Sequence, residues 1–320
     1  MKIKLIGFLF PLIFVVMGLC SCAQKEDNNV VRIGFFPNIS HAQALVAQQT
    51  GWFEKRLGKD IKVQWQAFNA GPDAMLALMS NSVALTYVGP NPVLNSFAKG
   101  AKVVVLSGAA EGGAGLVVNP KLNIKTPSDF KGKKIGTPQL ANTQDVACRA
   151  WLIKNGVKVS QSGGEASVIP VPNPSQLQAF VQGDLDAVWT VEPWITRLEK
   201  EGGAKMFLQQ NDTVTTVLAS TNKNFKNRAD IIKKILDAHI ELTAWINANP
   251  EQAQRHVKEA LERFTGGKIS AELIKTSWRR LNFTSKINKA DMQEFINSAY
   301  SCGFIRNKVD ISKIFVEAEK

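Results

Sequence analysis

One internal repeat constrains the fold of this chain more than any other feature of its sequence. Residue types recur at a constant offset of 102 positions, and the order of local patterns recurs with them. The matching pairs are Ile33-Gly34 with Ile135-Gly136, Pro72 with Pro174, Val83 with Leu185, and Tyr87 with Trp189. Each copy runs from a β-rich segment through a Pro-containing turn and a helical pattern to a strand that carries a large aromatic residue. Such self-similarity predicts two similar lobes, built one after the other.

β-rich apolar runs alternate with helical patterns from residue 31 onward. The predicted strands are Val31–Phe35, Ile61–Ala67, Val83–Val88, Val103–Ser107, Leu116–Val118, Lys134–Ile135, Ser167–Val171, Ala187–Thr190 and Val214–Ser220. Helical patterns fill most of the gaps between them. This alternation is typical of parallel sheets that are covered by helices. The predicted fold class is therefore α/β, which the repeat divides into two lobes.

The last third of the sequence differs in kind, because nearly all of it follows a helical pattern. The predicted helices are Ile231–Ala248, Glu251–Phe264, Ser270–Leu281 and Asp291–Ala299. Asn249-Pro250 and Gly266-Gly267 supply ordinary stop signals. We expect these helices to pack back on a lobe as support.

The beginning of the chain predicts export. Lys2 and Lys4 precede an apolar run that ends near Leu19 and is short for a membrane span of about 20 residues. We interpret residues 1–21 as a signal peptide; the alternative, an uncleaved anchor helix, stays open. Leu19-Cys20-Ser21-Cys22 resembles a bacterial lipobox, which implies that Cys22 carries a lipid. Residues 22–30 would then be a polar tether that holds the body at the periplasmic face of a bacterial membrane.

Charge and motif content narrow the function classes. The formal net charge is +12 at pH 7, but Lys and Arg are dispersed and are not interleaved with aromatic residues. We therefore expect no nucleic-acid partner. The chain also has no CxxC pair, no HExxH and no glycine-rich phosphate loop ending in Lys. These absences favour a binding protein over an enzyme, with no metal and no cofactor.

Two cysteines remain after the signal and the lipid are accounted for. Cys148 and Cys302 lie far apart in the sequence, and they form no recognisable framework of disulfides. An oxidising compartment would allow them to pair. We favour two separate buried thiols.

Candidate ligand-binding residues lie in the turns that follow the predicted strands. Ligands of open α/β sheets bind outside the carboxyl ends of the strands. The helix N-termini that begin there present free N–H groups and a partial positive charge, which suits an oxyanion. The candidates are Asn38, Ser40, His41, Asn69, Gly71, Gly89, Asn91, Thr137, Gln139, Asn142, Thr143 and Glu192. For any single turn, ordinary helix capping is the competing explanation.

Several of these segments carry a family resemblance. They are Ile33–Pro37, Ala44–Ala47, Gly51–Glu54, Phe68–Pro72 and Val88–Pro92, followed by Gly136–Ala147 and Asp186–Trp194. Together they resemble the nitrate/sulfonate/taurine branch of ABC-transporter substrate-binding proteins, over about residues 31 to 200. The resemblance implies a type II periplasmic-binding-protein fold with two crossovers and a ligand cleft between the two α/β lobes. Such a protein closes on a small ligand and delivers it to a permease driven by an ATPase. We place the first lobe at residues 31–110 and the second at 111–212; residues 213–320 return to the first lobe and add the C-terminal helices.

The ligand itself is less well determined. A sulfonate or nitrate stays anionic and can be held by neutral donors. A Glu192 carboxylate in the pocket would repel such an anion but would pair with an ammonium group, so a zwitterion such as taurine also stays open. Relatives of this architecture include a sulfinate-cleaving enzyme and pyrimidine-forming proteins of thiamine synthesis. A thiamine precursor is therefore a further candidate ligand, and an enzyme would need an activated nucleophile such as Cys148. We expect a monomer.

Overall fold

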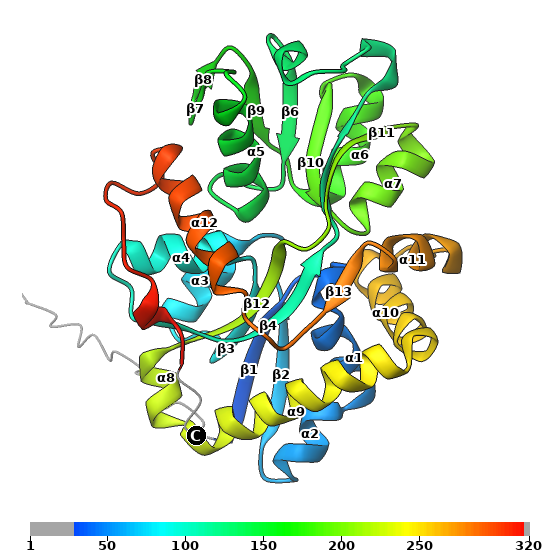
Figure 1. Cartoon of the computed structure of the whole chain (residues 1–320). Coiled ribbons are helices and arrows are strands. Elements are labelled where there is room, and N and C mark those ends of the chain that lie inside the picture. Colours follow the sequence, from blue (N-terminus) through cyan, green and yellow to red (C-terminus); the bar gives the residue numbers. More distant parts are fainter. Residues whose placement is uncertain (1–28, 317–320) are drawn as a thin grey trace, which may run out of the picture.

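Two β-sheets, one in each lobe, organise the molecule (Figure 1). The computed structural model describes residues 29–316, so the predicted signal segment 1–21 and the predicted lipid site Cys22 lie outside the described residues. In the six-stranded sheet of the first lobe the order is β13-β4-β12-β3-β1-β2. These strands are β1 (Val30–Phe35), β2 (Lys62–Ala67), β3 (Leu85–Val88), β4 (Val103–Gly112), β12 (Val214–Thr221) and β13 (Leu281–Phe283).

The second lobe has a five-stranded sheet in the order β11-β5-β10-β6-β9 and a separate two-stranded ribbon. The sheet strands are β5 (Ala114–Val118), β6 (Lys134–Thr137), β9 (Ser167–Pro170), β10 (Ala187–Val191) and β11 (Lys205–Gln210). The ribbon consists of β7 (Val159–Ser160) and β8 (Gly163–Gly164). Each sheet is mixed rather than all parallel, because the strands at the crossovers run against the repeated unit.

Helices cover both faces of the first sheet. The helices of residues 29–112 and 213–316 are α1 (Ala42–Thr50), α2 (Trp52–Leu57), α3 (Gly71–Met79), α4 (Pro90–Ala98), α8 (Asn222–Asn227), α9 (Ala229–Ala248), α10 (Pro250–Thr265), α11 (Ala271–Trp278) and α12 (Lys289–Ser301), with the short 3-10 helices η1 (Ile39–His41) and η4 (Ser312–Ile314). One core joins the sheet to α1, α2, α9 and α10, and another joins it to α3, α4 and α12. Val104 and Val105 enter opposite cores, as alternation along a strand requires.

The second lobe is smaller and its two faces are covered unequally. Its helices are α5 (Thr143–Lys154), α6 (Asn173–Gln182) and α7 (Trp194–Gly202), with the short 3-10 helices η2 (Pro120–Leu122) and η3 (Pro127–Phe130). Helices α6 and α7 pack on one face, and α5 packs on the other. The second lobe has no counterpart of α9 among its described residues.

The repeat read from the sequence is reproduced in the backbone. Ile33 pairs with Leu85 between parallel β1 and β3, and Ile135 pairs with Ala187 between parallel β6 and β10, again 102 positions later. The turn after the first crossover helix repeats as well. Val83 N–H donates to the Ala77 carbonyl and Leu185 N–H donates to the Ala179 carbonyl, at 3.2 and 3.3 Å.

The chain crosses between the sheets at two neighbouring places. It passes from β4 to β5 through Gly113, and it returns between β11 and β12 through residues 211–213. Gly112 and Gly113 have φ values of 73° and 65°, in the left-handed region that favours glycine. A Cβ atom at Gly112 would also lie 2.4 Å from the Arg280 carbonyl oxygen. Glycine is thus required where the two lobes join.

The helical character of the C-terminal third is present with one correction. The predicted helix Ser270–Leu281 ends earlier, because α11 stops at Trp278 and Leu281–Phe283 form β13. Leu281 pairs with Gly112 of β4, so this edge strand depends on a partner far away in the sequence.

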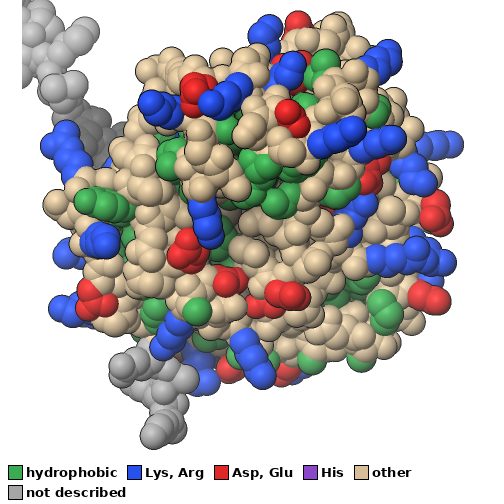
Figure 2. All heavy atoms as spheres, turned by 45° about the horizontal axis from the view of Figure 1, so that its top comes forward, with side chains coloured by type: hydrophobic (Ala, Val, Ile, Leu, Met, Phe, Trp, Pro, Cys, Tyr) green, Lys and Arg blue, Asp and Glu red, His purple; other side chains and the backbone are tan. Residues whose placement is uncertain are grey.

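Among residues 29–316 no helix has the length and apolar character needed to cross a membrane. Lys and Arg are scattered over the face drawn in Figure 2 and are mixed with acidic side chains.

Candidate functional site

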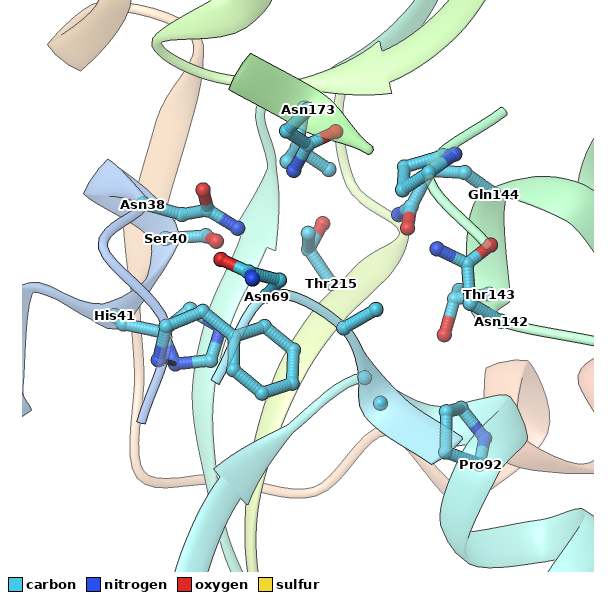
Figure 3. A pocket seen from close by; sticks show the side chains of 16 residues that line it. Asn38, Ser40, His41, Asn69, Pro92, Asn142, Thr143, Gln144, Asn173 and Thr215 are labelled. Carbon is cyan, nitrogen blue, oxygen red and sulfur yellow. Dashed lines mark hydrogen bonds between the residues drawn. The ribbon is translucent and has the colours of Figure 1, made fainter. Parts of the chain in front are cut away.

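A small polar pocket lies between the lobes, where helix N-termini from both sheets converge (Figure 3). It is lined by Phe36, Asn38, Ser40, His41, Asn69, Ala70, Gly71, Gly89, Pro92, Pro138, Asn142, Thr143, Gln144, Asn173, Val191 and Thr215. The helices that begin at its wall are η1, α3 and α4 of the first lobe and α5 and α6 of the second. First-turn N–H groups have no partner within their own helix, so this convergence concentrates donors and partial positive charge.

Three side-chain amides turn the same end toward the pocket. Asn38 Oδ1 accepts the indole N–H of Trp194 at 2.8 Å, and Asn142 Oδ1 accepts the backbone N–H of Asp145 at 2.8 Å. Asn173 Oδ1 accepts the Thr190 hydroxyl at 3.0 Å. Each carboxamide oxygen is therefore occupied by the protein, and each NH₂ group is left to donate. Figure 3 shows these residues, which lie at the starts of η1, α5 and α6, around one space.

Hydroxyl groups and one neutral histidine complete the donor set. Ser40 and Thr143 are buried in the pocket wall, and Thr143 Oγ1 accepts the Asn91 N–H at 3.3 Å. The Phe36 N–H donates to His41 Nδ1 at 3.3 Å, so Nε2 carries the proton. Burial lowers the pKa of His41 to about 3. His41 is thus a neutral donor at physiological pH, and no Lys, Arg, Asp or Glu is among the residues that line the pocket.

The turn before α5 is held in shape by a buried ion pair. Asp145 accepts from the Thr137 hydroxyl at 3.0 Å and from the Ala141 N–H at 2.9 Å. Arg149, one turn later, binds the Asp145 carboxylate at 3.1 Å and also donates to the Val168 carbonyl at 3.0 Å. This network fixes the N-terminus of α5 at the pocket without placing its own charges there.

Two glycines allow the walls to approach closely. A Cβ atom at Gly71 would lie 2.2 Å from Pro92 Cγ, where the starts of α3 and α4 meet. A Cβ atom at Gly89 would lie 2.4 Å from Thr143 Oγ1, which belongs to the other lobe. The space open to the centres of water molecules is about 20 Å³, so the pocket in this conformation is closed around a very small volume.

Most of the predicted candidates come together in this pocket. Asn38, Ser40, His41, Asn69, Gly71, Gly89, Asn142 and Thr143 line it. The structure gives three others different partners. The Asn91 amide donates to the Phe295 carbonyl at 3.0 Å, Thr137 bonds Asp145, and Gln139 lies near Asp73 at 3.4 Å. The side chains of Asn91, Thr137 and Gln139 therefore point away from the pocket.

Glu192 also faces away from the pocket. Its carboxylate accepts from Arg280 Nη1 at 2.6 Å and from the Thr196 hydroxyl at 2.9 Å. Arg280 also binds Glu199 through Nη2, so it joins the C-terminal segment to the second lobe. Burial raises the pKa of the Glu192 carboxyl, and the hydrogen bond and charge of Arg280 oppose this rise. Only the Glu192 backbone reaches the site turn, where its carbonyl accepts the Ile39 N–H at 3.2 Å.

Three polar lining residues were missed by the sequence prediction: Gln144, Asn173 and Thr215. Asn173 had a signal, because Asn173-Pro174 lies 102 positions after Gly71-Pro72. The sequence contained no such signal for Thr215, because this residue lies on the return strand β12 and not in a turn that follows a strand. Among residues 29–316 no group of His, Cys, Asp and Glu is arranged to hold a metal ion.

The fold and the pocket together define a two-lobed binding protein, and comparison with known proteins gives its family. The chain belongs to the NMT1-like family, which matches residues 24–261. It is 28% identical over 212 residues to a Bacillus subtilis (strain 168) protein named as an aliphatic sulfonates-binding protein, covering 64% of this chain and 61% of that relative. It is 27% identical over 162 residues to the taurine-binding periplasmic protein of Escherichia coli (strain K12), covering 50% and 48%.

The chain thus spans less than two thirds of the length of these two relatives. Among solved structures, the alkanesulfonate-binding protein SsuA from Xanthomonas axonopodis pv. citri, bound to MOPS, matches with a TM-score of 0.77 at 19% identity. That match covers 91% of this chain and 99% of the other. The resemblance and the fold class predicted from the sequence are confirmed.

Proposed function

We propose that this protein is the solute-binding component of an ABC importer, and that it captures a small oxyanion of the sulfonate or nitrate class between its lobes. The observation that carries the proposal is the orientation of Asn38, Asn142 and Asn173. Their oxygens accept internal hydrogen bonds, so the pocket offers N–H donors and repels ligands that must donate. Converging helix N-termini add the partial positive charge that an anion requires.

The pocket supports a simple anion over a zwitterion. Taurine carries an ammonium group, which would need an acceptor or a carboxylate beside the anion site. Glu192 was the sequence candidate for that role, but its carboxylate is occupied by Arg280 and Thr196. One relative is named for aliphatic sulfonates and another for taurine, so their names do not decide between a simple anion and a zwitterion. The preference for a simple anion therefore rests on the residues of this chain.

Binding is favoured over covalent catalysis on the same fold. An enzyme of the kind considered above would use a thiolate near the ligand. Cys148 is buried in the core of the second lobe, and burial raises the pKa of its thiol well above the usual range. Such a thiol stays protonated and is a poor nucleophile.

The N-terminal segment and the relatives support a proposal for the cellular setting. We propose that the protein is exported as a monomer, that Cys22 anchors it to the membrane through a lipid, and that a permease with its ATPase receives the ligand. One relative is named as periplasmic, which supports export. Labelling of the expressed protein with a radioactive fatty acid, compared with a Cys22→Ala variant, tests the anchor.

A thermal-shift panel tests the ligand class. Because a ligand that binds only the folded protein stabilises it by mass action, an anion at about 100 times its Kd adds roughly 2.7 kcal/mol. We expect methanesulfonate or nitrate to raise the melting temperature of the mature protein, and taurine to raise it less. Isothermal titration calorimetry then gives the affinities. A flat response to every anion would refute the proposal, and a preference for taurine would refute its restriction to simple anions.

A further inference from the structure

A second, larger cavity lies on the other flank of α5. About 600 Å³ is open there to the centres of water molecules, against about 20 Å³ in the anion pocket, and the two cavities share no lining residue. Its walls are α5, β10 and β11 of the second lobe and α12 of the C-terminal segment, close to the crossover residue Thr213. Cavities of about 300 to 1,000 Å³ are the usual size for small organic ligands.

The wall from the second lobe is aromatic. Trp151 and Trp189 lie edge to face with ring centroids 6.0 Å apart, and Leu208 extends this wall. In Figure 2 a hollow near the centre of the face is bordered by hydrophobic side chains. An apolar surface of this kind, open to solvent, is a recognised property of ligand-binding grooves.

The repeat shows that the second lobe, in its described residues, lacks a helix over this wall. Trp189 takes the position that Tyr87 has in the first lobe, where α9 covers the ring and His239 Nδ1 lies 2.9 Å from the Tyr87 hydroxyl. The second lobe has no counterpart of α9 among its described residues. The buried Trp189 indole N–H accordingly has no acceptor within the described chain. The groove therefore occupies the place that a covering helix takes in the first lobe.

The opposite wall carries negative charge. Asp291 and Glu294 lie one turn apart on α12, with Phe295 beside them. The Asp291 carboxylate accepts the Val214 N–H at 3.0 Å, and neither acid forms an ion pair with a Lys or Arg of residues 29–316. Lys154 lines the groove on the α5 side, so the acids outnumber the cation.

We propose that this groove is a second ligand site, which takes a small organic amine with an aromatic or aliphatic body. The ammonium group would lie at Asp291 and Glu294, and the apolar body would lie against Trp151 and Leu208. This ligand class is opposite in charge to that of the anion pocket. Because the walls belong to both lobes, an occupant also favours the lobe arrangement in which it touches both.

The test uses 2-phenylethylamine as the probe and 2-phenylethanol as its neutral counterpart, each titrated into the full mature protein by calorimetry. We expect the amine to bind at least tenfold more tightly than the alcohol. Glu294→Lys should weaken the amine at least tenfold by reversing a charge at an exposed position of the groove. Glu251→Lys makes the same change at an exposed position of α10 and should leave the affinity unchanged.

Three results would overturn the proposal. These are no amine binding at millimolar concentration, equal affinity for amine and alcohol, and equal effects of the two Glu→Lys variants. A fourth arm repeats the amine titration with methanesulfonate present. Competition would show that the groove is part of the anion site and would also overturn the proposal, whereas simultaneous binding supports a separate site. The amine titration is informative even if no anion binds, so failure here is distinct from failure of the importer function.

Discussion

At the scale of single residues, the buried His239 links the stability of the fold to pH. His239 is fully buried between Tyr87 and the Gly108 carbonyl, which lies 2.9 Å from Nε2. Since a carbonyl can only accept a hydrogen bond, Nε2 donates to it, and Nδ1 accepts a hydrogen bond from the Tyr87 hydroxyl. Burial lowers the pKa of His239 to about 4, whereas an unfolded histidine titrates near 6.5. At pH values between these two pKa values, the unfolded chain therefore binds a proton at His239 that the folded chain does not bind.

The free energy of unfolding should consequently fall as the pH is lowered from 6.5 toward 4. His239→Gln keeps a donor and an acceptor at this place but does not titrate. We expect the wild type to lose about 2 kcal/mol more than this variant between pH 7 and pH 4.5. Urea unfolding of both proteins at the two pH values measures the difference. Carboxyl groups make the same contribution to the pH dependence of both proteins. Equal losses of unfolding free energy in wild type and variant would therefore contradict a neutral, buried His239.

At the scale of elements, helix capping and ligand binding can be tested separately at the N-terminus of α5. Asn142 caps this helix through Oδ1 and turns its NH₂ group to the pocket. Asn142→Asp keeps a favourable cap but replaces the donor by a negative oxygen. Two like charges about 4 Å apart repel by about 4 kcal/mol at an effective dielectric constant of 20. We expect a loss of anion affinity of about 100- to 1,000-fold, with a melting temperature within a few degrees of wild type.

Asn123→Asp is the matched control for this prediction. Asn123 is exposed, lies outside the pocket and has a left-handed backbone that aspartate tolerates. Titration calorimetry should give the wild-type affinity for this variant. If Asn142→Asp bound the anion as tightly as Asn123→Asp does, Asn142 would be a cap and nothing more.

Local pattern predicted most of the elements but not the directions of the side chains. The offset of 102 predicted equivalent strands in the two lobes, such as β1 and β6, because both copies carry the same order of turns and apolar runs. β13 escaped prediction, since its three residues are a strand only beside β4. Every turn of the site follows a predicted strand. Whether a side chain there faces the pocket depends on distant partners, such as Arg280 for Glu192 and the Phe295 carbonyl for Asn91. No local pattern encodes those partners.

At the scale of the whole molecule, closure of the lobes depends on the missing side chain of Gly89. Its φ and ψ of −67° and 154° are open to any residue, so the requirement for glycine is not conformational. It arises because Thr143 of the other lobe comes within 2.4 Å of the position that a Cβ atom would take. Gly89→Ala should leave each lobe folded and prevent full closure.

Overpacking of this kind costs about 1 to 3 kcal/mol, which corresponds to roughly a five- to 150-fold weaker affinity for the anion. We expect small-angle scattering to show less contraction of Gly89→Ala on addition of the anion than of the wild type. In the double variant Gly89→Ala/Thr143→Ala the clash with the hydroxyl is removed and only the Cβ atom of residue 143, at 3.3 Å, stays close, so most of the contraction should return. Thr143→Ala alone provides the baseline, because it removes the pocket hydroxyl that accepts the Asn91 N–H, together with the γ-methyl group, without adding a side chain at Gly89. Full contraction and wild-type affinity in Gly89→Ala would mean that the lobes do not need to come this close to hold the ligand.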